Sequence, residues 1–236
     1  MIVKLPQEAD PWDYVHAEVA AISYRGVSAA CPMPGQTAVV VGQGMIGMFN
    51  TRWLLLHGVR VIVVDVEEFR LEPARKWGVA AALNAKEPDV RDRILSYCPG
   101  GADIVIEASA NPEGVKLAAS LLRKPGPQAL ATAYPTGSMH AHCHLWPRLV
   151  FQASYHNLIL ENKPQGVLPL VEGIVVIQPL DRTVGDRLQV IEQIRKGNLP
   201  IADLIDTPTP VDEAPTAYLN LLNRPDQFRG LAFKWT

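Results

Sequence analysis

The chain has 236 residues, which is enough for one large domain and too few for a multi-domain machine. Its hydrophobic content of 48% is sufficient for a buried core, and its formal charge of −2 provides no field that would attract nucleic acid or an anionic membrane. The three cysteines form no CxxC pair, the first residues do not resemble a secretory signal, and no apolar stretch is long enough to span a membrane. We therefore expect a cytoplasmic protein.

From residue 37 onward, short runs rich in β-branched residues alternate with helical stretches, which is the pattern of a parallel sheet with crossover helices. The expected strands are Thr37–Val41, Val59–Val64, Val79–Leu83, Asp103–Ala108, Gln128–Ala133 and Leu149–Tyr155. The expected helices are Ile46–Leu56, Phe69–Trp77, Val90–Tyr97 and Pro112–Leu122. Six strands with helices between them predict an α/β fold with a doubly wound, six-stranded parallel Rossmann sheet.

The pattern loosens after residue 160, where a segment with prolines and glycines is typical of a connection. Regular structure is then expected to return. The expected elements are a helix at Asp186–Lys196 ended by Gly197, a strand at Asp203–Thr207, a helix from Asp212 to about Leu222 and a strand at Gly230–Trp235.

Residues 42–47 read GQGMIG, a GxGxxG motif between an expected strand and an expected helix. The first glycine allows the tight turn, the second lets the backbone approach a pyrophosphate, and the third lets the helix pack on the strand. The N–H groups at the start of the helix then face the phosphates. The residues expected to bind them are Gly42, Gly44, Met45, Ile46 and Gly47.

Asp65 ends the second expected strand, where a carboxylate accepts hydrogen bonds from the adenosine ribose of a dinucleotide. A carboxylate there repels a 2′-phosphate, so NAD is favoured over NADP. Two alternatives remain open. In the first, Asp65 only caps the following turn and the glycines serve only packing. In the second, the sheet is that of a methyltransferase, which also has an acid at the end of its second strand.

The run from Thr37 to Ala85 resembles the cofactor-binding half of the medium-chain dehydrogenase/reductases, the zinc-type alcohol dehydrogenase superfamily. GADIVIEASA resembles the fourth strand of that family, and residues 211–235 resemble its C-terminal helix and closing strand. The resemblance implies that Asp65 binds the ribose, that Arg70 lies near the adenine and that Arg229 reaches the pyrophosphate. It also makes Ser109 a candidate contact of the nicotinamide ribose, with a helix-capping role equally open.

Members of this family carry a GroES-like domain with a catalytic zinc ahead of the nucleotide-binding domain. Only about 30 residues precede Cys31, and His16 and Glu18 form no His-Glu dipeptide, so the zinc site is not carried over and no metal is assigned. We expect a truncated member, in which both chain ends form a small remnant of the missing domain. The expected division is 1–30 for the N-terminal remnant and linking helix, 31–199 for the NAD-binding domain and 200–236 for the C-terminal helix and strand.

Three histidines, His140, His142 and His144, alternate along the chain after the fifth expected strand. In an extended segment they lie on one face, at the carboxyl edge of the sheet where cofactor and substrate meet. They could bind zinc with an open fourth position, relay a proton, or do neither. Tyr134 is a second candidate proton donor, with a purely structural role as its alternative.

The sequence therefore predicts an NAD-dependent oxidoreductase that moves a hydride between the nicotinamide and a carbonyl or secondary alcohol of a small molecule, without the zinc of the family. The alternative is a catalytically silent NAD-binding sensor or partner subunit. A homodimer is expected through the strand Leu149–Tyr155, because an apolar edge strand invites pairing.

Overall fold

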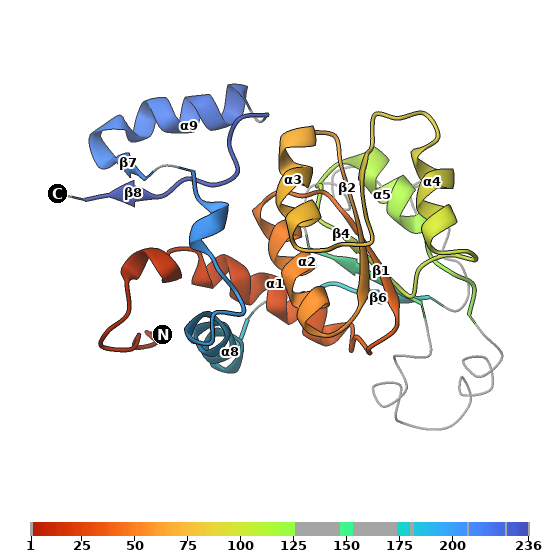
Figure 1. Ribbon diagram of the computed structural model, residues 1–236, viewed down its shortest axis with the longest axis horizontal. Helices are drawn as coiled ribbons and strands as arrows, with labels where there is room; N and C mark the ends of the chain where they lie inside the picture. Colours follow the sequence, from red (N-terminus) through yellow and green to blue (C-terminus); the bar gives the residue numbers. More distant parts are fainter. Residues whose placement is uncertain are drawn as a thin grey trace.

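The computed structural model describes residues 2–125, 147–152, 174–179, 182–206, 208–224 and 226–235. Its centre is a six-stranded parallel sheet in the order β3-β2-β1-β4-β5-β6 (Figure 1). The strands are β1 (Thr37–Val41), β2 (Arg60–Asp65), β3 (Ala81–Asn84), β4 (Ile104–Glu107), β5 (Arg148–Phe151) and β6 (Val175–Ile177). The expected doubly wound Rossmann sheet is confirmed.

Helices cover both faces of this sheet. Those on one face are α1 (Ala17–Ala29), α2 (Met45–Leu56), α3 (Glu68–Lys76) and α8 (Val184–Arg195), and those on the other are α4 (Val90–Tyr97) and α5 (Pro112–Ser120). Alternate residues of each strand enter opposite layers, as the pleat requires. In β1, Val40 packs with α2, whereas Val39 and Val41 pack towards α4 and α5.

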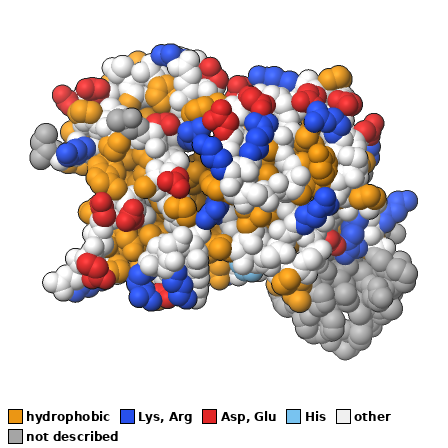
Figure 2. All heavy atoms as spheres, viewed as in Figure 1, with side chains coloured by type: hydrophobic (Ala, Val, Ile, Leu, Met, Phe, Trp, Pro, Cys, Tyr) orange, Lys and Arg blue, Asp and Glu red, His pale blue; other side chains and the backbone are white. Residues whose placement is uncertain are grey.

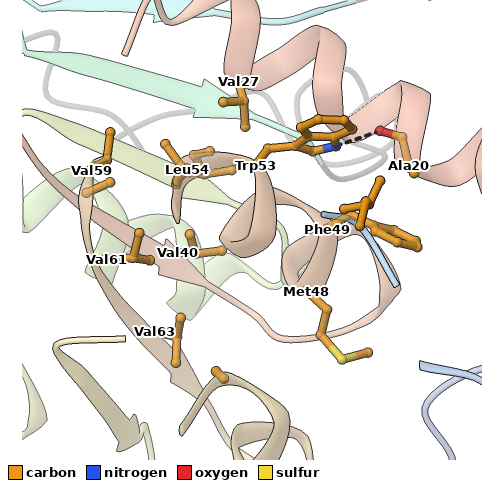
Figure 3. Close-up of a cluster of buried hydrophobic side chains, with 14 of the residues drawn as sticks. Ala20, Val27, Val40, Met48, Phe49, Trp53, Leu54, Val59, Val61 and Val63 are labelled. Atoms are coloured by element: carbon orange, nitrogen blue, oxygen red, sulfur yellow. Dashed lines mark hydrogen bonds between the residues drawn. The ribbon is translucent and has the colours of Figure 1, made fainter. Parts of the chain in front are cut away.

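Helix α1 is built into the first of these layers. Ala20, Ala21 and Val27 are fully buried against α2 and α8. The indole of Trp53 donates a hydrogen bond of 3.0 Å to the carbonyl of Ala20, and Figure 3 shows this bond within the apolar cluster. The packing therefore joins residues on both sides of the expected boundary at residue 30, and that boundary remains a prediction.

The two chain ends meet beside the sheet. A short parallel pair, β7 (Thr209–Pro210) and β8 (Phe233–Lys234), lies next to α9 (Ala214–Asn223), and Figure 1 shows them on the same side of the molecule as the N-terminus. Short 3-10 turns complete this part: η1 (Pro11–Tyr14), η3 (Ala202–Leu204) and η4 (Val211–Glu213). Figure 2 shows hydrophobic side chains exposed over this lobe, and the exposed ones include Leu219, Leu222 and Trp235.

Two expected elements need correction. A strand was expected at Asp203–Thr207, but η3 covers Ala202–Leu204, where Leu204 is buried in the core. Pairing begins only where the Thr209 N–H donates to the Ala232 carbonyl. The final strand is limited to Phe233–Lys234. The strand expected at Gln128–Ala133 lies outside the described residues.

The strand expected at Leu149–Tyr155 is observed in part, as β5, with residues 153–155 outside the described part of the chain, and β5 is not an edge strand. It pairs with β4 on one side and with β6 on the other, so its backbone is already hydrogen-bonded in the sheet. Among the described strands, the edge beside it is β6, which lies between the expected connection and the expected helix at Asp186–Lys196, where no element was expected. In the part of the chain that the structure describes, no helix is long and apolar enough to cross a membrane.

Candidate cofactor site

A cavity of about 460 Å³ lies at the carboxyl ends of β1, β2 and β4. Ligand pockets commonly have volumes of about 300–1,000 Å³. The carboxyl ends of parallel strands at a change in strand order are where open α/β sheets bind ligands, and β1 is the strand from which this sheet extends in both directions. The polar residues that line the cavity are Asp65, Arg70, Ser109, Asn111 and Glu113.

The glycine loop between β1 and α2 forms one wall. Gly42 has a φ of +91°, which an L side chain rarely adopts. A Cβ on Gly47 would lie 1.8 Å from the carbonyl oxygen of Gly42, so only glycine lets α2 pack this closely on the turn. These two glycines are therefore required by the backbone itself.

Gly44 differs from both. A Cβ at this position would meet no heavy atom within 4 Å, so the residue borders open space in the cavity. Gly44 is also the N-cap of α2, with no side chain capping the helix and no acidic residue in its first turn. The helix start thus offers uncapped N–H groups and a positive dipole end to this space. A pyrophosphate fits here because its negative charge and oxygen acceptors match what the backbone presents.

Asp65 ends β2 and joins it to the glycine loop. Its Oδ2 accepts a hydrogen bond of 2.5 Å from the Gln43 N–H, and its Oδ1 accepts one of 2.8 Å from the Glu67 N–H. The side chain lines the cavity although it is only 6% exposed. Each carboxylate oxygen has two lone pairs, so Asp65 retains acceptor capacity for ribose hydroxyls. It both fixes the loop and caps the turn after β2, which means that the turn-capping alternative and the ribose role are compatible.

The turn between β4 and α5 forms the opposite wall. Ser109 lies in this turn, but the residue that caps α5 is Asn111, whose side chain accepts a hydrogen bond of 2.9 Å from the Glu113 N–H. The hydroxyl of Ser109 instead donates to the carboxylate of Glu107. Of the two roles considered for Ser109, helix capping is therefore wrong.

The comparisons with known proteins find dehydrogenases. Residues 46–150 match the family described as zinc-binding dehydrogenase. A sorbitol dehydrogenase from Halalkalibacterium halodurans is 29% identical over 128 residues, which are 53% of this chain and 37% of the relative. Over this region the chain is similar to the zinc-type dehydrogenases, in agreement with the resemblance seen in the sequence.

Solved structures of dehydrogenases share the fold. An alcohol dehydrogenase from Escherichia coli CFT073, complexed with NADH, superposes with a TM-score of 0.75 at 17% identity and covers 99% of this chain and 62% of its own. A putative zinc-binding dehydrogenase from Sinorhizobium meliloti 1021, bound to NADP, superposes with a TM-score of 0.67 at 21% identity. The match covers 91% of this chain and 57% of the dehydrogenase. The chain thus spans about 60% of these dehydrogenases and a smaller share of its curated relatives.

Two arginines were expected at the cofactor of a medium-chain dehydrogenase. Arg70 lines the cavity with Asp65. Arg229 does not: its guanidinium lies 3.7 Å from the ring centroid of Phe69 and pairs with Glu72 at 3.1 Å. It holds the C-terminal segment on α3, and its role at a pyrophosphate remains a prediction.

The expected proton donors His140, His142, His144 and Tyr134 lie outside the described residues. Within the described ranges, no group of three His, Cys, Asp or Glu side chains could hold a metal ion. A described imidazole, His16, lies at the start of α1, where burial lowers its pKa. Its Nε2 is 3.4 Å from where a Cβ on Gly230 would be.

The sequence reasoning missed two buried polar residues that shape the site. Gln43, inside the motif, accepts a hydrogen bond of 3.2 Å from Thr51 and so joins the glycine loop to α2. Glu107 closes the run DIVIE, and it is fully buried at the end of β4. A charged residue that ends an otherwise apolar strand was the available signal for it.

Proposed function

We propose that this protein is an oxidoreductase that binds NAD and transfers a hydride between its nicotinamide and a carbonyl or secondary alcohol. The observation that carries the proposal is the open space at Gly44, which lies between an uncapped helix start and the carboxylate at the end of β2. The kinship with dehydrogenases of alcohols and sugar alcohols supports this reaction class.

Each part of the dinucleotide is assigned to a different group of the cavity. When bound, a nicotinamide cofactor supplies the hydride chemistry. The N–H groups at the start of α2 would hold the pyrophosphate, and Asp65 would accept from the ribose. A carboxylate at that position disfavours the 2′-phosphate of NADP, which supports NAD as the partner. Arg70, in the same cavity, would lie against the adenine.

Proton transfer is assigned to the segment from His140 to His144, with Tyr134 as second candidate and no zinc of the family type. An imidazole titrates near neutrality, so it can donate and accept the proton of an alcohol without unusual tuning. Single His→Ala substitutions are expected to lower turnover by about 10²-fold at one position and to leave NAD affinity nearly unchanged. Metal analysis of the purified chain tests the zinc-binding alternative for these histidines.

A homodimer is part of the proposal, and the edge strand β6 supports it. Val176, in the middle of this strand, is 46% exposed, and among the described strands β6 has a neighbour on one side, β5. Sedimentation should give a dimer for the wild type and a monomer for Val176→Lys. A wild-type chain that is monomeric at every concentration contradicts this part. The cytoplasm is the proposed compartment, where the thiols of Cys31 and Cys98 stay reduced.

Calorimetric titration with NAD and NADP, followed by an assay with a panel of alcohols and ketones, tests the function. We expect NAD to bind more tightly and at least one substrate to be turned over. Tight NAD binding without turnover of any substrate would favour a sensor or partner subunit. A chain that binds neither dinucleotide contradicts the proposal.

A further inference from the structure

A buried carboxylate lies beneath the cofactor cavity. Glu107 ends β4 and is fully buried, whereas the cavity lies just beyond it, at Ala108 and Ser109. Its Oε1 accepts a hydrogen bond of 2.9 Å from the Ser109 N–H and a second from the Ser109 hydroxyl. Burying a carboxylate is costly unless hydrogen bonds compensate, and these two bonds tie the buried Glu107 carboxylate to Ser109.

The turn that Ser109 begins has an unusual backbone. Ala110 has a φ of +53°, in the left-handed region that residues with a Cβ rarely adopt. On its far side, the Asn111 N–H donates a hydrogen bond of 3.2 Å to the Ser109 hydroxyl oxygen. Such a conformation persists only where its surroundings hold it. The hydrogen bonds from Glu107 through Ser109 to Asn111 bracket Ala110 and provide that restraint.

The same turn is in direct contact with the glycine loop. A Cβ on Gly42 would lie 2.7 Å from the Ser109 nitrogen and 2.8 Å from the Ala108 carbonyl carbon. On the other side, a Cβ on Gly114 of α5 would lie 2.1 Å from the Ser109 hydroxyl oxygen and 3.0 Å from Glu107 Oε1. The glycine loop and α5 therefore both pack on the turn that Glu107 holds, and a shift of this turn must move a cavity wall.

We infer that Glu107 is a positioning residue of the cofactor site: it holds the Ser109–Asn111 turn against Gly42 and so fixes the distance between the glycine loop and α5. The inference rests on the proposed function for the identity of the ligand, but not for the contact between turn and loop. It also sets the chemistry of Ser109. Because the hydroxyl proton goes to Glu107, Ser109 offers a ligand an acceptor oxygen and no side-chain donor, which suits a ribose hydroxyl.

The test compares Glu107→Ala and Glu107→Gln with a matched control, Asp186→Ala. Asp186 is also a buried acid whose carboxylate accepts from a backbone N–H, that of Thr183, but it caps α8 and does not line the cavity. Two quantities are measured on the full chain, well below the melting temperature of each variant. They are the dissociation constant for NAD and the hydrogen exchange rates of the amides at residues 42–44 and 109–111.

We expect Glu107→Ala to weaken NAD binding about tenfold or more and to accelerate exchange in both segments, because the turn loses its buried acceptor. Glu107→Gln, which keeps an acceptor oxygen, should retain most of the wild-type NAD affinity and most of the wild-type protection from exchange. Asp186→Ala should lower the melting temperature and leave both quantities at wild-type values. If Glu107→Ala does not fold, Ser109→Ala removes the hydroxyl from the same contact and should accelerate exchange at residues 109–111 and 42–44.

Two results would overturn the inference. One is wild-type NAD affinity together with wild-type exchange in Glu107→Ala. The other is an equal change in the Asp186→Ala control, which would mean that any buried acid has this effect. If the wild-type chain binds neither NAD nor NADP, the proposed function fails, and the exchange rates at residues 42–44 still decide whether Glu107 holds the loop.

Discussion

The Oδ2 of Asp65 accepts a hydrogen bond of 2.5 Å from the backbone N–H of Gln43. One carboxylate thus connects the end of β2 to the middle of the glycine loop, 22 residues earlier in the chain. The residue expected to recognise the ribose is at the same time the residue that holds the loop for the pyrophosphate. If the proposed function holds, binding of the two halves of an adenosine diphosphate group is coupled through this single side chain.

Substitution of Asp65 separates the two roles. We expect Asp65→Ala to reduce NAD affinity about tenfold or more, because the ribose acceptor and the restraint on the loop are lost together. NADP affinity should fall less, since the variant also removes the charge that repels a 2′-phosphate. Titration calorimetry measures both. The control is Asp103→Ala, which removes a carboxylate that pairs with Arg123 at 2.6 Å outside the cavity. Equal losses of NAD and NADP affinity would leave Asp65 only its role in the loop.

Substitution by alanine should affect mainly cofactor binding at Gly44 and mainly stability at Gly47. Gly44→Ala adds a methyl group to open space at a φ of −69°, so its cost in unfolding free energy should stay below about 1 kcal/mol. Cofactor binding should fall by more than about tenfold, because the methyl group stands where the pyrophosphate approaches the backbone. Gly47→Ala places a methyl group against the Gly42 carbonyl and should cost about 1–3 kcal/mol. Chemical denaturation and NAD titration together measure the contrast, and a Gly44→Ala chain with wild-type NAD affinity would place the phosphates elsewhere.

The parts of the fold that the sequence predicts well are those with local causes. TAVVV is an apolar run ended by a glycine turn, and β1 has the expected bounds. By contrast, β6 has three residues and no pattern of its own, so its pairing with β5 defines it. A strand was expected at Asp203–Thr207, but Leu204 is buried in the core layer that also holds α1 and α2, and a 3-10 turn forms there instead.

The candidate site divides in the same way. The glycine motif and Asp65 are recognisable because their spacing is set by one turn and one strand. The pairing of Arg229 with Glu72 joins residues 157 positions apart, and no local pattern predicts it. Glu107 was missed because a sequence does not show whether an acid at a strand end is solvated or buried. Its structural role becomes visible only with Ser109 and Gly114 around it.

The ion pairs between α1 and α8 predict an acid-dependent loss of stability. A hydrogen bond from Arg187, together with one from Arg182, lowers the pKa of Glu18 to about 2 from its usual 4.5. The folded state therefore favours the charged carboxylate, so the stabilisation is complete above about pH 4.5 and is lost as the pH falls towards 2. Because Glu18 is 44% exposed, solvent screening limits the effect, and Glu18→Gln should cost about 1 kcal/mol at pH 7 and much less at pH 2.

Glu192 provides the control for this prediction. Arg195 and Lys196 lower its pKa to about 2 as well, but these ion pairs join residues of α8 and its C-cap to one another. Glu192→Gln should therefore leave the urea midpoint unchanged at both pH values. The prediction fails if the midpoints of the Glu18→Gln and wild-type chains differ by the same amount at pH 7 and pH 2.

Removal of the hydrogen bond from Trp53 to Ala20 tests whether the segment before residue 31 belongs to the folding unit of the sheet. Trp53→Phe removes the donor and part of the ring contact with Tyr24, whose centroid is 4.8 Å away, and should cost about 1–2 kcal/mol. Trp77→Phe is the matched control, since that ring is only partly buried and its contact with Arg52 survives in a phenyl ring. Urea unfolding measures both.

Deletion of residues 1–30 extends this test. It would expose the face of α2 that α1 covers, including Phe49 and Trp53, which are at most 2% exposed in the whole chain. Because burial of such side chains supplies most of the stability of a layer, we expect the shortened chain to lose cooperative unfolding and near-ultraviolet circular dichroism. A shortened chain with a native spectrum, together with a Trp53→Phe variant of wild-type stability, would instead make residues 31–199 an independent domain.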